Sequence, residues 1–221
     1  MSHRRVFLLA GFAAVVLPSL RAEPARATLP GAEKTATALA NELAGESAKL
    51  PRNSLYQLDL KLTDQDGRAS LWADAAKRTG TPPGARLVSM FYTHCDMVCP
   101  MLFEAIRQLE QGLPPAARSN LQVGLISLDP QRDDVATLQK TAAQRAGDAK
   151  RWRLYRTQTQ DVRQIAALLG VKYHKLANGE FSHSTPIILL DAQGVELART
   201  EKIVQPEPDF LKSLRIATQA G

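Results

Sequence analysis

Arg86-Leu-Val-Ser-Met-Phe-Tyr-Thr-His-Cys-Asp-Met-Val-Cys-Pro100 is the stretch that decides the fold of this 221-residue chain. Its first part, 86–93, is an apolar run typical of a buried strand, and a helical segment, 101–110, follows the proline. The short loop between them holds both cysteines of the protein, Cys95 and Cys99. Exposed amides and the dipole at a helix N-terminus favour the thiolate over the thiol. Thiolates are required both for redox exchange and for binding soft metal ions.

Two cysteines separated by three residues are open to several interpretations. A structural disulfide that closes so small a loop would remove little chain entropy, which disfavours a purely structural role. A Cys-x-x-Cys pair would indicate a thioredoxin-type redox centre. The wider Cys-x-x-x-Cys spacing weakens that interpretation and leaves room for an ion between the sulfurs. Two sulfurs do not complete a metal site, so a third ligand is expected elsewhere in the chain.

The four histidines are the candidates for that third ligand. His3 lies in the N-terminal targeting segment. His94 adjoins Cys95, and a side chain beside a ligand usually points elsewhere, so it is either a modulator of the thiol pKa or a plain loop residue. His174 lies among lysines and is expected in solvent. His183 lies where a loop turns into the apolar strand 185–190, and it is either a surface residue or the missing ligand.

Four motifs occur in the same order as in the Sco/SenC family of copper chaperones, also called synthesis-of-cytochrome-oxidase proteins, and resemble the motifs of that family. They are the cysteine stretch 91–100, the segment Ile126-Ser-Leu-Asp-Pro-Gln-Arg-Asp-Asp134, Trp152 with the run 162–173, and Phe181-Ser-His-Ser184 before a strand that ends in Asp191-Ala-Gln-Gly194. The resemblance covers roughly Leu55 to Ile203. It implies a copper ion, Cu(I) or Cu(II), held by Cys95, Cys99 and His183.

The resemblance also implies a function and a partner. The first hypothesis is a periplasmic metallochaperone that delivers copper to the dinuclear copper centre of cytochrome c oxidase subunit II during its assembly. The second is a thiol–disulfide oxidoreductase, in which Cys95 and Cys99 act through a mixed disulfide on cysteines of the oxidase subunit or of another periplasmic target. A peroxide-scavenging or redox-sensing thiol protein is a weaker third, because no peroxidatic motif is present. The first role requires no catalytic turnover, so we lean away from an enzyme.

Two residues depart from the pattern of that family. Ser182 stands before the histidine where the family usually has Asp, which removes a carboxylate close to the expected site. Asp96 follows the first cysteine where the family often has Pro. An acidic group beside Cys95 opposes thiolate formation by like-charge repulsion. Both changes leave the three ligands in place and bear on copper affinity and copper transfer.

The N-terminal residues 1–27 have the layout of a secretory signal peptide. Arg4 and Arg5 precede an apolar stretch, 6–17, and Ala25-Arg26-Ala27 fits a cleavage site. The apolar stretch is shorter than the about 20 residues of a comfortable membrane span, although a short membrane anchor is an alternative. The paired arginines also resemble a twin-arginine export signal. We therefore expect a protein of the periplasm, exported by the Sec or twin-arginine route, with a membrane tether as the alternative.

The net charge of +6 does not indicate nucleic-acid binding. Four arginines and one acidic residue fall within 1–27, so removal of this segment halves the charge. Residues 28–53, rich in Ala, Glu and Lys, are expected to be a flexible or helical tether, and 54–221 one domain with its own core. The basic group Lys150-Arg151-Trp152-Arg153 with Arg156 is expected to be a solvated face, with docking to an acidic partner as the alternative.

Alternating strands and helices predict an α/β fold. The alternating run 55–62 and the Asp66-Gly67 turn predict a hairpin with 69–72. The expected elements that follow are strand 86–93, helix 99–111, strand 121–128, helix 133–146, strand 152–156, helix 159–169, a hairpin of 185–190 with 195–200, and a helix from about 207. This order fits a thioredoxin-like sandwich, with a central mixed sheet flanked by helices. Loops at one end of such a sheet can bring Cys95, Cys99 and His183 together.

Overall fold

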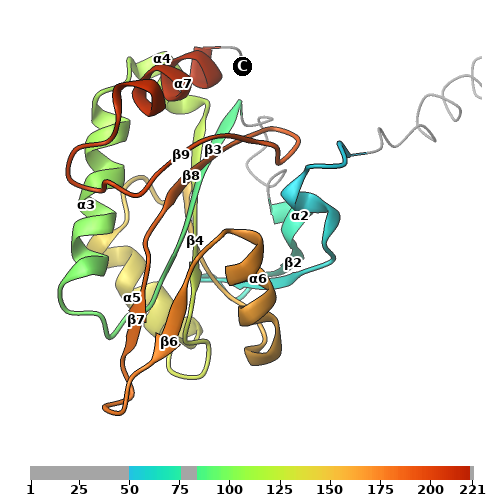
Figure 1. The fold of residues 1–221 in the computed structure, drawn as a ribbon, viewed down its shortest axis with the longest axis vertical. Helices are drawn as coiled ribbons and strands as arrows, with labels where there is room; N and C mark the ends of the chain where they lie inside the picture. Colours follow the sequence, from blue (N-terminus) through green and yellow to red (C-terminus); the bar gives the residue numbers. More distant parts are fainter. Residues whose placement is uncertain (1–49, 76–83, 220–221) are drawn as a thin grey trace, which may run out of the picture. The chain divides into compact units, whose positions relative to one another are not determined.

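The computed structural model describes residues 50–75 and 84–219 of the chain (Figure 1). The chain divides into two units, Met1–Ala48 and Lys49–Gly221, and every described residue lies in the second. The predicted signal peptide and almost all of the predicted tether lie outside the described residues, so both stay predictions. Within 50–75 and 84–219, none of the helices has the length and apolar character needed to cross a membrane.

A seven-stranded mixed sheet forms the centre of the domain, in the order β2-β1-β5-β4-β3-β8-β9. The three middle strands β3, β4 and β5 are parallel to one another. On either side of them, β1 runs antiparallel to β5 and β8 runs antiparallel to β3. A separate two-stranded hairpin is formed by β6 and β7. The strands are β1 Lys61–Asp64, β2 Ala69–Leu71, β3 Ala85–Phe91, β4 Leu121–Ser127, β5 Trp152–Arg156, β6 Tyr173–Lys175, β7 Phe181–His183, β8 Ile187–Asp191 and β9 Glu196–Thr200.

Helices cover both faces of this sheet. Figure 1 shows α3 and α5 on one side and α6 on the other. The connections explain this arrangement, because two right-handed crossovers in the same direction, β3-α3-β4 and β4-α5-β5, place their helices on the same face. The helices are η1 Leu55–Gln57, α2 Trp72–Ala75, α3 Val98–Gln111, α4 Pro115–Ser119, α5 Val135–Arg145, η2 Thr159–Asp161, α6 Val162–Leu168 and α7 Pro208–Gln219.

The core holds α3 firmly against the sheet. All seven residues of β3 and all seven of β4 are buried, as expected of central parallel strands covered on both faces. Phe103 of α3 stacks on Trp152 of β5, with ring centroids 6.0 Å apart. The indole of Trp152 donates a 2.7 Å hydrogen bond to the buried carboxylate of Glu110 at the other end of α3. These contacts hold α3 against the sheet, and Cys99 lies in the first turn of this helix.

The predicted mixed sheet and its flanking helices are confirmed, and two local predictions are wrong. The alternating run 55–62 is a strand only from Lys61, because Ser54 caps a 3₁₀ turn by accepting the Tyr56 amide hydrogen bond. The predicted partner segment 69–72 is a strand only as far as Leu71, since Trp72 begins α2. Sequence patterns did not reveal α4 or the β6–β7 hairpin.

Lys150 is exposed as predicted, but the rest of the basic group at 150–156 is not a solvated face. Arg151 forms an ion pair with the buried carboxylate of Glu110 and a second, at 3.3 Å, with Asp148. Trp152 lies in the core. Arg153 donates to the Ala149 carbonyl oxygen at 3.0 Å, and Arg156 to that of Pro130 at 2.7 Å. These guanidinium groups are therefore used within the fold, where they join β5 to the segments beside it.

Candidate metal centre

The loop between β3 and α3 presents two thiols at the start of the helix. Cys95 lies in the loop and Cys99 is the second residue of α3. The backbone N–H of Cys99 donates to Cys95 Sγ at 3.2 Å, and that of Cys95 donates to the Tyr92 carbonyl oxygen at 3.4 Å. Both cysteines are free thiols and are buried, with 7% and 2% of their surface exposed. Cys95 is thus the more accessible of the two.

The two thiols differ sharply in acidity. The neighbouring Cys99 thiol donates to the sulfur of Cys95, and together with backbone amides of residues 97–99 it lowers the pKa of Cys95 to about 5, against the opposing effect of burial. The same shared proton and burial raise the pKa of Cys99 far above its usual range. Asp96, expected to oppose ionisation of Cys95, is exposed and does not decide its charge. At neutral pH the pair consists of one thiolate and one thiol.

We predict that metal-free, reduced protein reacts with iodoacetamide at Cys95 at nearly the same rate at pH 7 and pH 6, with the rate falling by half near pH 5. The thiolate is the reacting species, so a lowered pKa extends the plateau downward in pH. The measurement is the rate of Cys95 alkylation by mass spectrometry across this range. Cys99→Ala should raise the Cys95 pKa and slow labelling at pH 7, because it removes the largest cause of the shift. A tenfold fall in the wild-type rate for each pH unit below 8 would contradict the assignment.

His183 is the third side chain at the centre. It is the last residue of β7, so it belongs to the β6–β7 hairpin and not to the loop expected from the sequence. Its Nδ1 lies 3.0 Å from the Ser184 carbonyl oxygen. A carbonyl oxygen only accepts, so in the neutral imidazole Nδ1 carries the proton and Nε2 keeps its lone pair. Nε2 is buried and has no hydrogen-bond partner among the described residues. An unpaired buried acceptor is suited to coordinate an ion.

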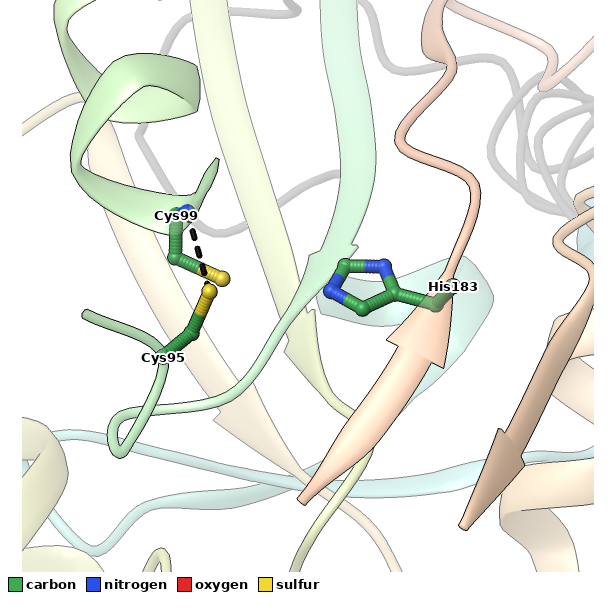
Figure 2. A group of neighbouring side chains, drawn as sticks. All are labelled: Cys95, Cys99 and His183. Atoms are coloured by element: carbon green, nitrogen blue, oxygen red, sulfur yellow. Dashed lines mark hydrogen bonds between the residues drawn. The ribbon is translucent and has the colours of Figure 1, made fainter. Parts of the chain in front are cut away.

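The three side chains meet although they come from distant parts of the sequence. Figure 2 shows the imidazole of His183 pointing toward the sulfurs of Cys95 and Cys99. Their ligand atoms all lie within 4.8 Å of one another, and no second group of this kind occurs within 50–75 and 84–219. Two soft sulfurs and one imidazole nitrogen suit a soft or borderline transition-metal ion. The geometry of the described site therefore fits a metal ion.

The other described histidines lie apart from this group, as the sequence predicts. His94 is exposed, and its Nδ1 is 3.2 Å from Thr93 Oγ1. His174 is exposed on β6, opposite Ser182 of β7. Ser182, which replaces the usual acidic residue, is exposed as well. His3 falls outside the described residues.

Tyr92 supports the imidazole and was missed by the sequence analysis. Its ring packs edge-on against His183, with centroids 5.7 Å apart, and in the same way against Phe181 at 5.4 Å. Its hydroxyl donates to the Phe181 carbonyl oxygen at 3.3 Å. Tyr92 therefore links the end of β3 to the hairpin that carries His183. No pattern in the sequence signals this role beyond its position three residues before Cys95.

Segment 127–134 contacts both the cysteine loop and the β6–β7 hairpin. These contacts explain the motif Ile126-Ser-Leu-Asp-Pro-Gln-Arg-Asp-Asp134 of the sequence analysis. The buried carboxylate of Asp133 accepts hydrogen bonds from the Thr93 amide at 3.2 Å, the Thr93 hydroxyl at 2.5 Å and the Ser127 hydroxyl at 2.5 Å. Arg132, which pairs with Asp129, donates to the Gly179 carbonyl oxygen at 3.0 Å and to the Glu180 carboxylate at 3.3 Å. Asp133 thus fixes the cysteine loop, while its neighbour Arg132 fixes the β6–β7 hairpin.

Comparison with solved structures supports the architecture. ScoI of Bradyrhizobium japonicum with copper bound is 20% identical, with a TM-score of 0.56, covering 72% of this chain and 96% of that one. Yeast Sco1 with copper bound is 15% identical, with a TM-score of 0.56, covering 73% and 87%. BsSco, a member of the Sco family of cytochrome c oxidase assembly proteins in which a disulfide switch was identified, is 17% identical, with a TM-score of 0.59, covering 77% and 97%. These similarities confirm the predicted thioredoxin-like fold.

Sequence comparison identifies the family directly. No curated protein sequence matches the chain. The family model SCO1/SenC matches residues 49–215, which span the whole described domain up to the last turn of α7 and include both cysteines and His183. The sequence motifs, the fold and the match over most of the chain agree, and the chain belongs to the SCO1/SenC family.

Proposed function

We propose that this protein binds one copper ion through Cys95, Cys99 and His183 and delivers it during the assembly of cytochrome c oxidase. The observation that carries the proposal is the convergence of two sulfurs and an unpaired imidazole nitrogen within 4.8 Å. Copper fits this donor set because thiolates prefer Cu(I) and imidazole accommodates copper in either oxidation state. Membership of the SCO1/SenC family and the copper-bound relatives support the same ion.

The site is suited to passing its ion on. Three protein ligands leave a coordination position through which a ligand of a recipient protein can attack. We propose the dinuclear copper centre of oxidase subunit II as the recipient, supported by the oxidase-assembly role of the related BsSco. We further propose that residues 1–27 direct the protein to the periplasm, with a membrane tether as the alternative, because of their basic start and apolar stretch.

The assignment of His183 provides a direct test of the proposal. We expect His183→Ala to weaken Cu(II) binding by more than the about 10- to 100-fold that loss of an outer-sphere partner costs. Cu(I) binding should weaken less, because two thiolates alone can hold Cu(I) in a near-linear arrangement. The measurement is the affinity for each ion in competition with chelators of known strength, on protein with both thiols reduced.

His94→Ala and His174→Ala are the matched controls for this experiment. Both imidazoles are exposed and lie apart from the sulfurs, so neither substitution should change either affinity appreciably. Equal losses from all three substitutions would remove the reason for assigning His183. Reduced wild-type protein that retains no copper against a weak chelator would overturn the proposed function itself.

The lowered pKa of Cys95 favours a second role, thiol–disulfide exchange with a partner. A thiolate at neutral pH attacks a disulfide of the target, and Cys99 then resolves the mixed disulfide. A Cys99→Ser variant distinguishes thiol–disulfide exchange from copper delivery, because it lacks the thiol that resolves the mixed disulfide. An oxidoreductase would accumulate a covalent complex with the oxidised copper-binding domain of subunit II, whereas a protein that only delivers copper would form none.

A further inference from the structure

Two methionines lie exposed beside the metal centre. The described residues contain three methionines, of which Met90 in β3 is completely buried, as is usual for a methionine in a core. Met97 and Met101, in contrast, expose 74% and 43% of their surface. Neither side chain therefore serves mainly to fill the core.

The positions of these two methionines relate them to the cysteines. Met97 is the N-cap of α3, and Met101 follows four residues later, one helical turn away. Side chains at such a spacing lie on the same face of a helix. Cys99 lies between them in sequence, and Cys95 lies two residues before Met97. The two thioethers therefore lie on the outer face of the short segment whose inner face carries the buried thiols.

The chemistry of a thioether differs from that of a thiol in two useful respects. Its sulfur is a soft, neutral donor that suits Cu(I). It carries no proton to lose and forms no disulfide, so it stays available whether Cys95 and Cys99 are reduced or oxidised. Two exposed thioethers one helical turn apart are therefore donors that a weaker Cu(I) site requires, and they are present in both redox states of the cysteines.

We propose that Met97 and Met101 form an entry site that binds Cu(I) transiently and passes it to the cysteine centre. This proposal rests on the copper-binding function proposed above. The transfer is a ligand exchange without change of oxidation state. The bonds from Cu(I) to the thioethers break as bonds to the sulfurs of Cys95 and Cys99 form, and the proton that the thiol of Cys99 loses passes to solvent.

The first experiment measures the rate at which the reduced protein captures Cu(I) from a small-molecule Cu(I) chelate. In a Met97→Leu/Met101→Leu variant we expect the rate to fall about tenfold, the change produced by losing ~1.4 kcal/mol of transient binding. The equilibrium affinity should stay within a factor of about two, because the final ligands are unchanged. Leucine keeps the apolar volume and removes only the sulfur, so it separates metal binding from apolar contact.

Val204→Ser is the matched control for apolar contact. Val204 exposes 76% of its surface and lines the same cavity of about 350 Å³ as Met101, but it has no donor atom. Its substitution should leave the capture rate unchanged. A wild-type rate in the double leucine variant, or an equal slowing in Val204→Ser, would overturn the proposal.

The second experiment detects the thioether bonds themselves. Protein with Cys95 and Cys99 joined in a disulfide is titrated with Ag(I), a soft ion of the same charge as Cu(I), while the methyl resonances of the methionines are followed by NMR. We expect the methyl groups of Met97 and Met101 to shift together with one equivalent, while that of buried Met90 stays in place. Absence of shifts at the two exposed methionines would overturn the entry site.

The two experiments distinguish failure of the entry site from failure of the proposed function. If reduced wild-type protein binds Cu(I) tightly but the methionine substitutions and the Ag(I) titration have no effect, the entry site is wrong and the cysteine centre stands. If reduced wild-type protein retains no Cu(I), the proposed function is wrong, and the entry site, which rests on it, fails too.

Discussion

Replacing either Cys95 or Cys99 with alanine should abolish tight Cu(I) binding while the domain remains folded. Each substitution removes one of the two sulfurs that suit the ion, and the remaining sulfur and imidazole cannot replace it. The fold does not depend on these sulfurs, because α3 is held by Phe103 and by the bond from Trp152 to Glu110. Loss of one sulfur should reduce the free energy of unfolding by only about 1 kcal/mol.

The measurement for this prediction pairs a copper affinity with a stability. Reduced Cys95→Ala and Cys99→Ala proteins are titrated with Cu(I) against a strong chelator, and their thermal unfolding is followed by circular dichroism. His94→Ala, next to Cys95 in the sequence but exposed, serves as the control for a change in this loop. A protein lacking both cysteines that takes up one copper ion with unchanged affinity would sink the assignment of the ligands.

Oxidation of the cysteine pair should remove copper binding at this centre as completely as mutation does. Cys95 and Cys99 are both free, they lie in one short segment, and the amide of one contacts the sulfur of the other, so a disulfide can form between them. A disulfide sulfur is no longer a thiolate ligand. In an oxidising compartment, copper loading would then require prior reduction.

The test is a copper titration of the oxidised and the reduced protein with free thiols counted in parallel. Reduced protein should show two free thiols before copper is added and should then bind one copper ion tightly. Oxidised protein should show no thiols and no tight binding, and the addition of dithiothreitol should restore both. Full binding by protein with an intact disulfide would refute this redox switch and point to a site elsewhere.

The sequence predicted best where a single segment determines the outcome. The apolar strand, the cysteine loop and the helix after it are adjacent, so a local pattern was enough to place both thiols at the start of α3. His183 could be selected only by resemblance to a family, because its approach to the sulfurs depends on the packing of the hairpin against Tyr92. No periodicity within the sequence encodes that contact.

The errors have physical causes of the same kind. The β6–β7 hairpin consists of two three-residue strands outside the main sheet, and its polar residues give no strand signal. Arg132 and Tyr92 hold it in place, and the contact of Arg132 with Gly179 joins residues 47 positions apart. Arg151 and Arg156 were misjudged because Arg151 pairs with Glu110 of α3 and Arg156 donates to the distant Pro130 carbonyl oxygen. Long-range partners of charged side chains cannot be deduced from local charge patterns.

The contacts of segment 127–134 with both sides of the metal centre have a consequence for the proposed release of the ion. Protein contacts through Asp133 and Arg132, rather than the ion, keep the sulfurs and the imidazole together. In the delivery proposed above, a departing ion would therefore leave a preorganised site, and little conformational entropy would be gained or lost on loading and unloading. In the proposed delivery, the barrier to release would then lie in the bonds to the ion itself, and a recipient would meet almost the same surface before and after transfer.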